Sequence, residues 1–222
     1  MLFRSANSAA SSVACPGRWV NSVSSSTHSR STRSTAVIRL PVTCVEYGLT
    51  IRAARCTLTS MPRTALIVAV PEAEPAVAAL RLEHDSSAAL GVPAHVTILF
   101  PFLDAAEVDE HAIEDVLGQH DAFDFDLVSV ETFDDGHVYL APTGAERFVA
   151  LTDSVWRRWP DHPPYEGAFE TVVPHLTVSD HPLRCELELP IRARAAAVTL
   201  IEERADGRWT ERRRFPLRDR PG

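Results

Sequence analysis

The chain has 222 residues, a formal net charge of −8 and 45% hydrophobic residues, which is enough for one large domain or two small ones. No stretch approaches the roughly 20 apolar residues that a membrane span requires, and no apolar run precedes a small-residue cleavage site. We therefore expect neither a membrane-spanning chain nor a secretory signal.

The composition changes near Met61. Seven arginines and a single acid, Glu46, give residues 1–60 a formal charge of +6. Because the whole chain has a formal charge of −8, residues 61–222 carry −14. Residues 1–60 are also rich in Ser and Thr without a hydrophobic period, so they bury too little apolar surface to offset the entropy of ordering. We predict a disordered leader there, followed by a single domain over residues 61–222.

The leader's composition fits an organelle transit peptide, and it also fits upstream sequence translated by mistake. We favour Met61 as the true start, because a strand pattern follows it at once. All 22 basic residues are arginines, as in a strongly GC-biased coding sequence, which favours the mistaken start.

Cysteine usage is typical of a cytosolic domain. Three of the four cysteines lie in the leader, and Cys185 alone lies in the domain. A single cysteine forms no internal disulfide, no Cys-x-x-Cys motif suggests zinc, and the neighbours of Cys185 give no sign of a partnered nucleophile. We therefore expect a cytoplasmic location.

The domain begins with alternating strand and helix patterns. A continuous apolar run predicts a strand over residues 64–70, and a proline and an acid predict the start of a helix over residues 71–83. A second apolar run predicts a strand over residues 95–102. Asp104 then has the residue type of an N-cap for a helix that ends near Gly118.

The remaining elements echo this order. They are a hairpin over 123–133 and 137–140, a helix over 143–159, a proline-rich loop over 160–174, a strand over 175–179 and a hairpin over 192–203 and 209–217. Each half thus has a strand followed by a hairpin with an Asp-Gly turn, which indicates a weak internal repeat. The repeat is approximate, because a helix follows the first strand whereas only residues 180–190 follow the second.

Two similar strings lie 80 positions apart, and each has a proline shortly before His-x-Thr in an apolar run. Successive strand side chains alternate between faces, so His95 shares a face with Thr97, and His175 with Thr177. If the two strands are neighbours, two imidazoles and two hydroxyls meet, which suits acid and base work on a phosphate ester. The strings are Pro-Ala-His-Val-Thr-Ile-Leu-Phe at 93–100 and Val-Pro-His-Leu-Thr-Val at 173–178.

About one His-x-Ser or His-x-Thr is expected by chance, and a third, at 84–86, lacks the strand context and fits a loop or helix end. For the matched pair the alternative is two half-buried strand histidines with ordinary hydrogen bonds. The shared proline and the common polar face favour a functional pair.

The strings, the element order and the approximate repeat resemble the two-histidine (2H) phosphoesterase superfamily, particularly its 2'-5' RNA ligase branch. The resemblance covers residues 61–222 and none of the leader. The residues that carry it are Ala-His-Val-Thr-Ile-Leu-Phe-Pro-Phe at 94–102, Pro-Tyr-Glu-Gly-Ala-Phe at 164–169 and Val-Pro-His-Leu-Thr at 173–177. The short connection over residues 180–190 departs from the family's usual helix.

The resemblance implies an α+β, bilobal fold in which two antiparallel sheets flank a central cleft with pseudo-twofold symmetry. Members of the family open 2',3'-cyclic phosphates at RNA ends, or related cyclic or 2'-5' linked nucleotides, without a metal ion, and some act as ligases. The expected catalytic residues are His95 and His175 as the acid and base pair, and Thr97 and Thr177 as donors to the phosphate oxygens.

Outer contacts are predicted from residue type. Tyr165, Phe169 and Phe102 are candidates for stacking a base or ribose, with loop anchoring and core packing as the alternative. Arg81 is a candidate phosphate contact, with a solvated arginine on a helix face as the alternative. Three arginines at 212–214 fit edge protection of a terminal strand.

A domain with a formal charge of −14 lacks the basic stripe of a polyanion binder, so we expect a small nucleotide or an RNA terminus as substrate. We expect no cofactor, no membrane, no protein partner and a monomer. Two rivals are a nucleotide-binding module without turnover and a metal-dependent hydrolase that uses both histidines and Asp180. Against the second, the sequence has no His-x-x-x-His and no carboxylate cluster at metal spacing.

Overall fold

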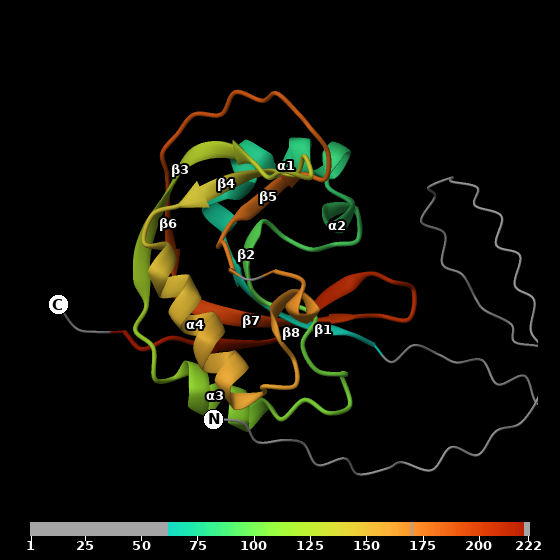
Figure 1. The fold of residues 1–222 in the computed structure, drawn as a ribbon, viewed down its shortest axis with the longest axis vertical. Coiled ribbons are helices and arrows are strands. Elements are labelled where there is room, and N and C mark those ends of the chain that lie inside the picture. Colours follow the sequence, from blue (N-terminus) through green and yellow to red (C-terminus); the bar gives the residue numbers. More distant parts are fainter. Residues whose placement is uncertain (1–61, 170, 220–222) are drawn as a thin grey trace, which may run out of the picture. The chain divides into compact units, whose positions relative to one another are not determined.

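The computed structural model describes residues 62–169 and 171–219 (Figure 1). The predicted leader lies outside these residues. The strands are β1 (Thr64–Ala69), β2 (His95–Leu99), β3 (Phe123–Thr132), β4 (Val138–Pro142), β5 (Leu176–Ser179), β6 (Ile191–Ala195), β7 (Ala197–Glu203) and β8 (Trp209–Pro216). The helices are α1 (Glu74–His84), α2 (Ser86–Ala89), α3 (Glu110–Leu117) and α4 (Ala145–Arg158), and the short 3₁₀ helices are η1 (Pro71–Ala73) and η2 (Pro164–Gly167).

The strands form two antiparallel sheets of four strands each, as predicted. Their strand orders are β2-β1-β7-β8 and β5-β4-β3-β6 (Figure 1). The strands of the two His-x-Thr motifs, β2 and β5, therefore occupy matching positions, each at one edge of its sheet.

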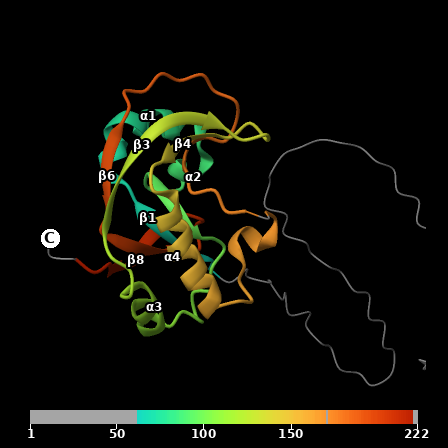
Figure 2. The ribbon, with the colours of Figure 1, turned by 60° about the vertical axis from the view of Figure 1, so that its left-hand side comes forward.

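The two halves of the chain exchange parts. The hairpin that follows the first motif, β3–β4, joins the sheet of β5, and the hairpin that follows the second motif, β7–β8, joins the sheet of β2. The helices are exchanged in the same way: α1 contacts β5, the strand of the second motif, and α4 contacts β2, the strand of the first. Figures 1 and 2 both show α1 beside the sheet of β3 and β4. This exchange holds the two motif edges against each other.

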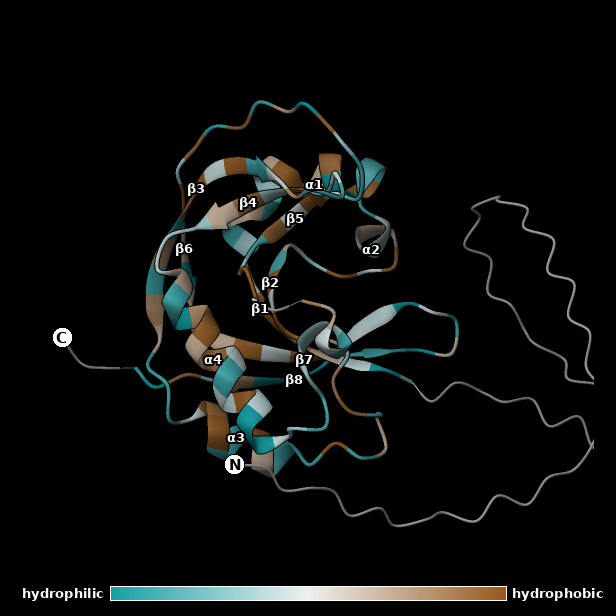
Figure 3. Ribbon diagram, viewed as in Figure 1, coloured by the Kyte–Doolittle hydropathy of each residue, from teal (hydrophilic) through white to brown (hydrophobic). Residues whose placement is uncertain are grey.

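One apolar core spans both sheets and both long helices. Phe148 of α4 lies at its centre and is fully buried, with the rings of Phe123 and Phe125 each 5.0 Å from its own. Figure 3 shows the apolar residues along β1 and β5, of which Leu66, Val68, Leu176 and Val178 belong to this core. The core therefore fixes the sheets that carry the motifs.

Arg212 and Arg213 hold α3 against the edge strand β8, whereas Arg214 pairs with Glu211 on β8 itself. Arg213 pairs with Glu110 at 3.1 Å and with Glu114 at 2.6 Å, and Arg212 pairs with Glu110 at 2.9 Å. These side chains therefore serve α3 packing rather than a basic binding face.

The predicted N-cap at Asp104 is wrong. Helix α3 begins at Glu110, and Asp109 is its N-cap, because the Asp109 side chain accepts from the backbone N–H groups of His111 and Ala112. Asp104 instead forms an isolated bridge with Arg63 that extends the pairing beyond β1. An aspartate that caps a helix and one that ends a strand look alike in the sequence.

The strand predicted over residues 192–203 is two strands in different sheets. β6 pairs with β3, and β7 pairs with β1 and β8, so the chain changes sheets at Ala196. Both predicted hairpins, β3–β4 and β7–β8, are confirmed. In the described part of the chain, every helix is too short or too polar to span a bilayer.

Replacing Phe148 by alanine should lower the free energy of unfolding by about 3–5 kcal/mol, because a fully buried ring is lost from a packed core. Urea unfolding of the full chain measures the change. Trp156→Ala on the same helix, where the side chain is 42% exposed, is the matched control. Equal losses for the two variants would contradict the position of the core.

Candidate active site

The two motifs have the same local structure. His95 and His175 are half-buried, the residues after them, Val96 and Leu176, are fully buried, and Thr97 and Thr177 are half-buried again. This alternation puts each histidine and its threonine on the side of the strand away from the core. The face predicted for both pairs is confirmed.

A backbone carbonyl two residues earlier orients each imidazole. His95 Nδ1 lies 2.8 Å from the carbonyl oxygen of Pro93, and His175 Nδ1 lies 2.7 Å from that of Val173. A carbonyl only accepts, so Nδ1 carries the hydrogen in both rings. Nε2 is then the nitrogen with the lone pair in each neutral ring.

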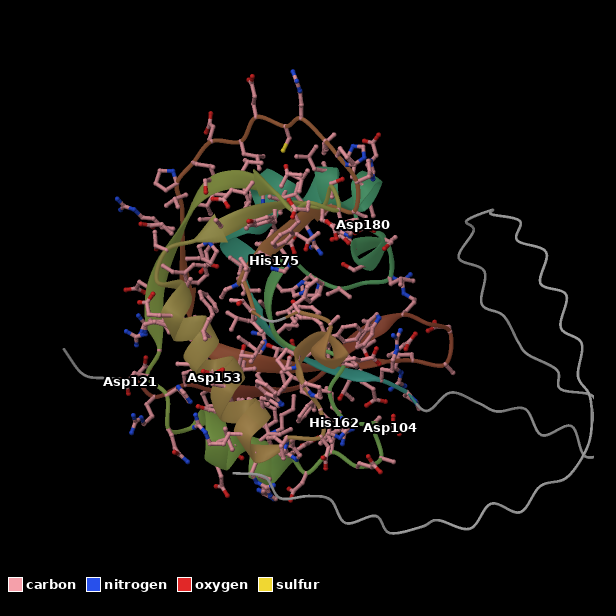
Figure 4. All side chains as sticks on the ribbon, viewed as in Figure 1. Asp104, Asp121, Asp153, His162, His175 and Asp180 are labelled. Carbon is pink, nitrogen blue, oxygen red and sulfur yellow. The ribbon has the colours of Figure 1, made fainter. Side chains whose placement is uncertain are left out.

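The two motifs lie on neighbouring strands. Strands β2 and β5 contact each other although they belong to different sheets. Figure 4 shows His175 at the end of the loop that enters β5. Segments that lie 80 positions apart in the sequence therefore meet where the two sheets adjoin.

Burial disfavours the protonated, charged form of both imidazole rings. It lowers the pKa of His95 from 6.5 to about 4, with a smaller lowering from Arg81. Burial also lowers the pKa of His175, an effect to which His137 adds and which Asp135 opposes. Both rings are thus neutral at pH 7, and both Nε2 atoms are available to accept a proton.

Aromatic side chains from the β3–β4 hairpin pack around His175. The rings of Phe133 and Tyr139 lie 5.0 and 5.5 Å from its ring and stack on each other at 4.1 Å. At the hairpin turn, His137 Nδ1 lies 2.9 Å from Asp135 Oδ1. The sequence analysis missed this group. No local signal marked it, because only the pairing of β4 with β5 brings this hairpin to His175.

Tyr165 and Phe169 lie on the loop before the second motif. The backbone N–H of Tyr165 donates to the carbonyl of Phe100 just after β2, at 2.7 Å. Burial raises the phenol's pKa, so the hydroxyl stays protonated. Phe169 packs edge-on against Tyr165 and is 62% exposed. Tyr165 thus lies at the first motif, and Phe169 offers a ring beside it.

The substrate contact predicted for Phe102 is corrected. Its side chain is only 4% exposed and belongs to the core, where it packs edge-on against Trp159 at 5.2 Å. A ring covered to this extent has no open face on which a base can stack. The core-packing alternative holds for Phe102.

The phosphate contact predicted for Arg81 is also corrected. Arg81 is 2% exposed and pairs with the equally buried Asp85 at 2.8 Å. It also donates to the carbonyl of Val92, next to the Pro93 whose carbonyl binds His95. Arg81 therefore holds the loop that positions the His95 ring, and its alternative as a solvated arginine is wrong as well.

Two hollows lie at the ends of β2. One of about 660 Å³ reaches Ala69 and Pro93 beside the start of the strand, and one of about 370 Å³ reaches Phe100 and Glu166 beyond its end. Within residues 62–169 and 171–219, no group of three or more His, Cys, Asp or Glu side chains suits a metal ion. The expectation of metal-free chemistry stays a prediction.

A family model described as the 2'-5' RNA ligase superfamily matches residues 69–209, which include both motifs. The chain belongs to this superfamily. A family of 2H phosphoesterases and RNA ligases accounts for two equivalent His-x-Thr strands at the edges of two sheets. No curated protein matches the chain.

Solved structures share the fold. LigT from E. coli in complex with 3'-AMP is 17% identical, with a TM-score of 0.51 over 71% of this chain and 98% of that one. LigT in its apo form is 19% identical, with a TM-score of 0.50 over 71% and 99%. At these identities the likeness establishes the two-sheet fold and nothing finer.

The low pKa of His95 predicts a loss of stability in acid. Between about 4 and 6.5 the unfolded chain binds a proton that the folded His95 does not, so stability falls as the pH drops through this window. NMR titration of the ring should give a pKa near 4, and His95→Asn should flatten the acid side of the stability curve. The exposed His111 provides the control, His111→Asn. A ring that titrates near 6.5 would contradict the buried environment.

Proposed function

We propose that this chain is a metal-independent phosphodiesterase that acts on 2',3'-cyclic phosphates, or related cyclic or 2'-5' linked nucleotides. The observation that carries the proposal is the matched pair of imidazoles. His95 and His175 are oriented by equivalent carbonyls, and each ring presents its own Nε2 atom from one of two strands that contact each other. Two such groups supply the base and the acid that cleavage of a phosphodiester requires.

In the hydrolytic direction, one neutral imidazole takes a proton from water as the water oxygen bonds to phosphorus. The bond from phosphorus to one ribose oxygen breaks, and the other ring gives that oxygen a proton. Since both rings are neutral in the free protein at pH 7, one must gain its proton when substrate binds. The negative charge of the phosphodiester favours this, because an adjacent anion raises the pKa of an imidazole. Either ring suits either role.

Thr97 and Thr177 lie on the same strand faces as the two histidines. Their hydroxyls are proposed to donate to the non-bridging phosphate oxygens, where negative charge concentrates in the transition state. Strand geometry fixes each hydroxyl two residues from its imidazole. The phosphate is thus bound by two donors while the two rings move protons.

A small nucleotide or an RNA terminus fits this site better than a long duplex. Arg81, Arg212 and Arg213 are in ion pairs, so these arginines do not form an open basic stripe. Phe169 is proposed to stack a base beside Tyr165. We also propose that the protein is a monomer in the cytoplasm and that it needs no cofactor, membrane or protein partner.

The ligase reading of the family uses the same groups. In ligation a 5'-hydroxyl takes the place of water: one ring takes the hydroxyl's proton as its oxygen bonds to phosphorus, and the other ring gives a proton to the ribose oxygen that leaves. Supply of a 5'-hydroxyl RNA together with a cyclic-ended RNA tests that direction, and a 2'-5' linked product would favour it.

The full chain should open a 2',3'-cyclic nucleotide, or an RNA with a cyclic phosphate end, equally fast with and without EDTA. His95→Ala and His175→Ala should each lower kcat by roughly 100- to 10,000-fold, because each removes one proton-transfer group. Product formation followed by ³¹P NMR measures both effects.

His111→Ala, which removes an exposed imidazole from α3, should retain wild-type turnover. Full activity of either motif variant would sink the paired mechanism. Loss of turnover in EDTA would favour the metal-dependent hydrolase, and binding without turnover would favour the nucleotide-binding module.

A further inference from the structure

The residue that follows the second motif strand binds the junction between α1 and α2. Asp180 comes directly after β5 and is half-buried. Its backbone N–H donates to the carbonyl of His84, and its Oδ2 accepts from the N–H of Ser86, both at 2.8 Å. Figure 4 shows Asp180 in the same region as α2. Asp180 thus holds the peptide groups on both sides of Asp85, where α1 ends and α2 begins.

The Asp85 side chain binds Arg81. Both side chains are buried, and Arg81 Nη2 lies 2.8 Å from Asp85 Oδ2. The other carboxylate oxygen, Oδ1, accepts from the backbone N–H of Ser87 at 2.9 Å. Separating a buried ion pair leaves an uncompensated charge at high cost, so the guanidinium stays with the carboxylate. The position of Asp85 therefore determines the position of the guanidinium.

The Arg81 guanidinium holds the loop before the first motif. Its Nη2 donates to the carbonyl of Val92 at 3.3 Å, and the N–H of Val92 donates to the carbonyl of Ser87 at 3.1 Å. The next residue, Pro93, has no N–H, and its carbonyl binds His95 Nδ1 at 2.8 Å. The direction of that carbonyl therefore depends on how its neighbours, Val92 among them, are held.

We infer that Asp180 is a positioning residue for His95. This inference rests on the proposed function, in which His95 transfers a proton through Nε2. Printed in the fold is a continuous series of hydrogen bonds and covalent links from Asp180, through the buried ion pair and the loop, to the ring. A second support comes from Glu74, whose Oε1 accepts from the N–H of Ala94 at 2.6 Å. Loss of the Asp180 carboxylate therefore loosens the His95 ring without displacing its strand.

Asp180→Ala tests the inference, because it removes the carboxylate and keeps the backbone bond to His84. With a 2',3'-cyclic nucleotide as the probe, kcat should fall about 3- to 10-fold, as expected for the loss of one hydrogen bond. KM should change little, because the groups proposed to bind the phosphate are unaltered. Asp180→Asn keeps an acceptor oxygen and should restore most of the lost kcat.

Ser86→Pro removes the same hydrogen bond from its other end. Ser86 is the first residue of α2, a position that suits proline, and Asp85 before it has an extended backbone with φ −121° and ψ 111°. This variant should reproduce the loss of kcat with the Asp180 carboxylate still present. Asp180→Ala should have no further effect in the Ser86→Pro background.

Long-range ¹H–¹⁵N NMR of the rings needs no substrate. In Asp180→Ala and in Ser86→Pro, the Nδ1 and Nε2 signals of His95 should move toward each other, because a looser ring populates both tautomers, while those of His175 stay unchanged. Asp109→Ala is the matched control. It also removes an aspartate that accepts backbone N–H groups at the start of a helix, and it should leave kcat and the His95 signals as in the wild type.

Unchanged His95 signals or an unchanged kcat in both Asp180→Ala and Ser86→Pro would overturn the inference. The same changes in Asp109→Ala would overturn it as well, because they would follow from any loss of stability. A wild-type chain without turnover, in which the His95 signals still respond to Asp180→Ala, would count against the proposed function alone.

Discussion

The contact between the edge strands β2 and β5 is the constraint on which the site depends. It brings together the two strands that carry the His-x-Thr motifs, while one apolar core spans both sheets. The exchange of hairpins and helices maintains it, because α1 packs on the sheet of β5 and α4 packs on β2. If each half folded on itself, the two histidines would lie in separate units. The topology thus places the two copies of the motif on strands that contact each other.

The same arrangement sets the chemistry of the rings. Burial lowers the pKa of both His95 and His175, which favours their neutral forms, while the carbonyls of Pro93 and Val173 select the tautomer. A neutral imidazole with a directed Nε2 is a competent base, and it becomes an acid only when an anion arrives. This behaviour suits the proposed phosphodiester substrate, which brings negative charge with it.

The motif strands, their polar faces and both hairpins were predictable, because strand alternation and Asp-Gly turns are local signals. The sheet change at Ala196 was not, since β6 and β7 form one continuous strand pattern. The prediction that Asp104 is a helix N-cap failed because the same residue type occurs at a helix cap and at a strand end. The prediction that Arg81 contacts a phosphate failed because its pairing with Asp85 and its burial depend on how α1 packs against the loop before His95. Local signals can be read from the sequence, whereas contacts between residues that are far apart in the chain cannot.

The central claim is that both imidazoles contact one phosphate through Nε2. Long-range ¹H–¹⁵N NMR of the histidine rings, recorded while adenosine 2'-monophosphate is added to the full chain, tests it most directly. The account predicts that His95 and His175 both start as the Nδ1–H tautomer and that both Nε2 signals shift along one saturation curve. A response from only one ring, or either ring in the Nε2–H tautomer, would contradict it.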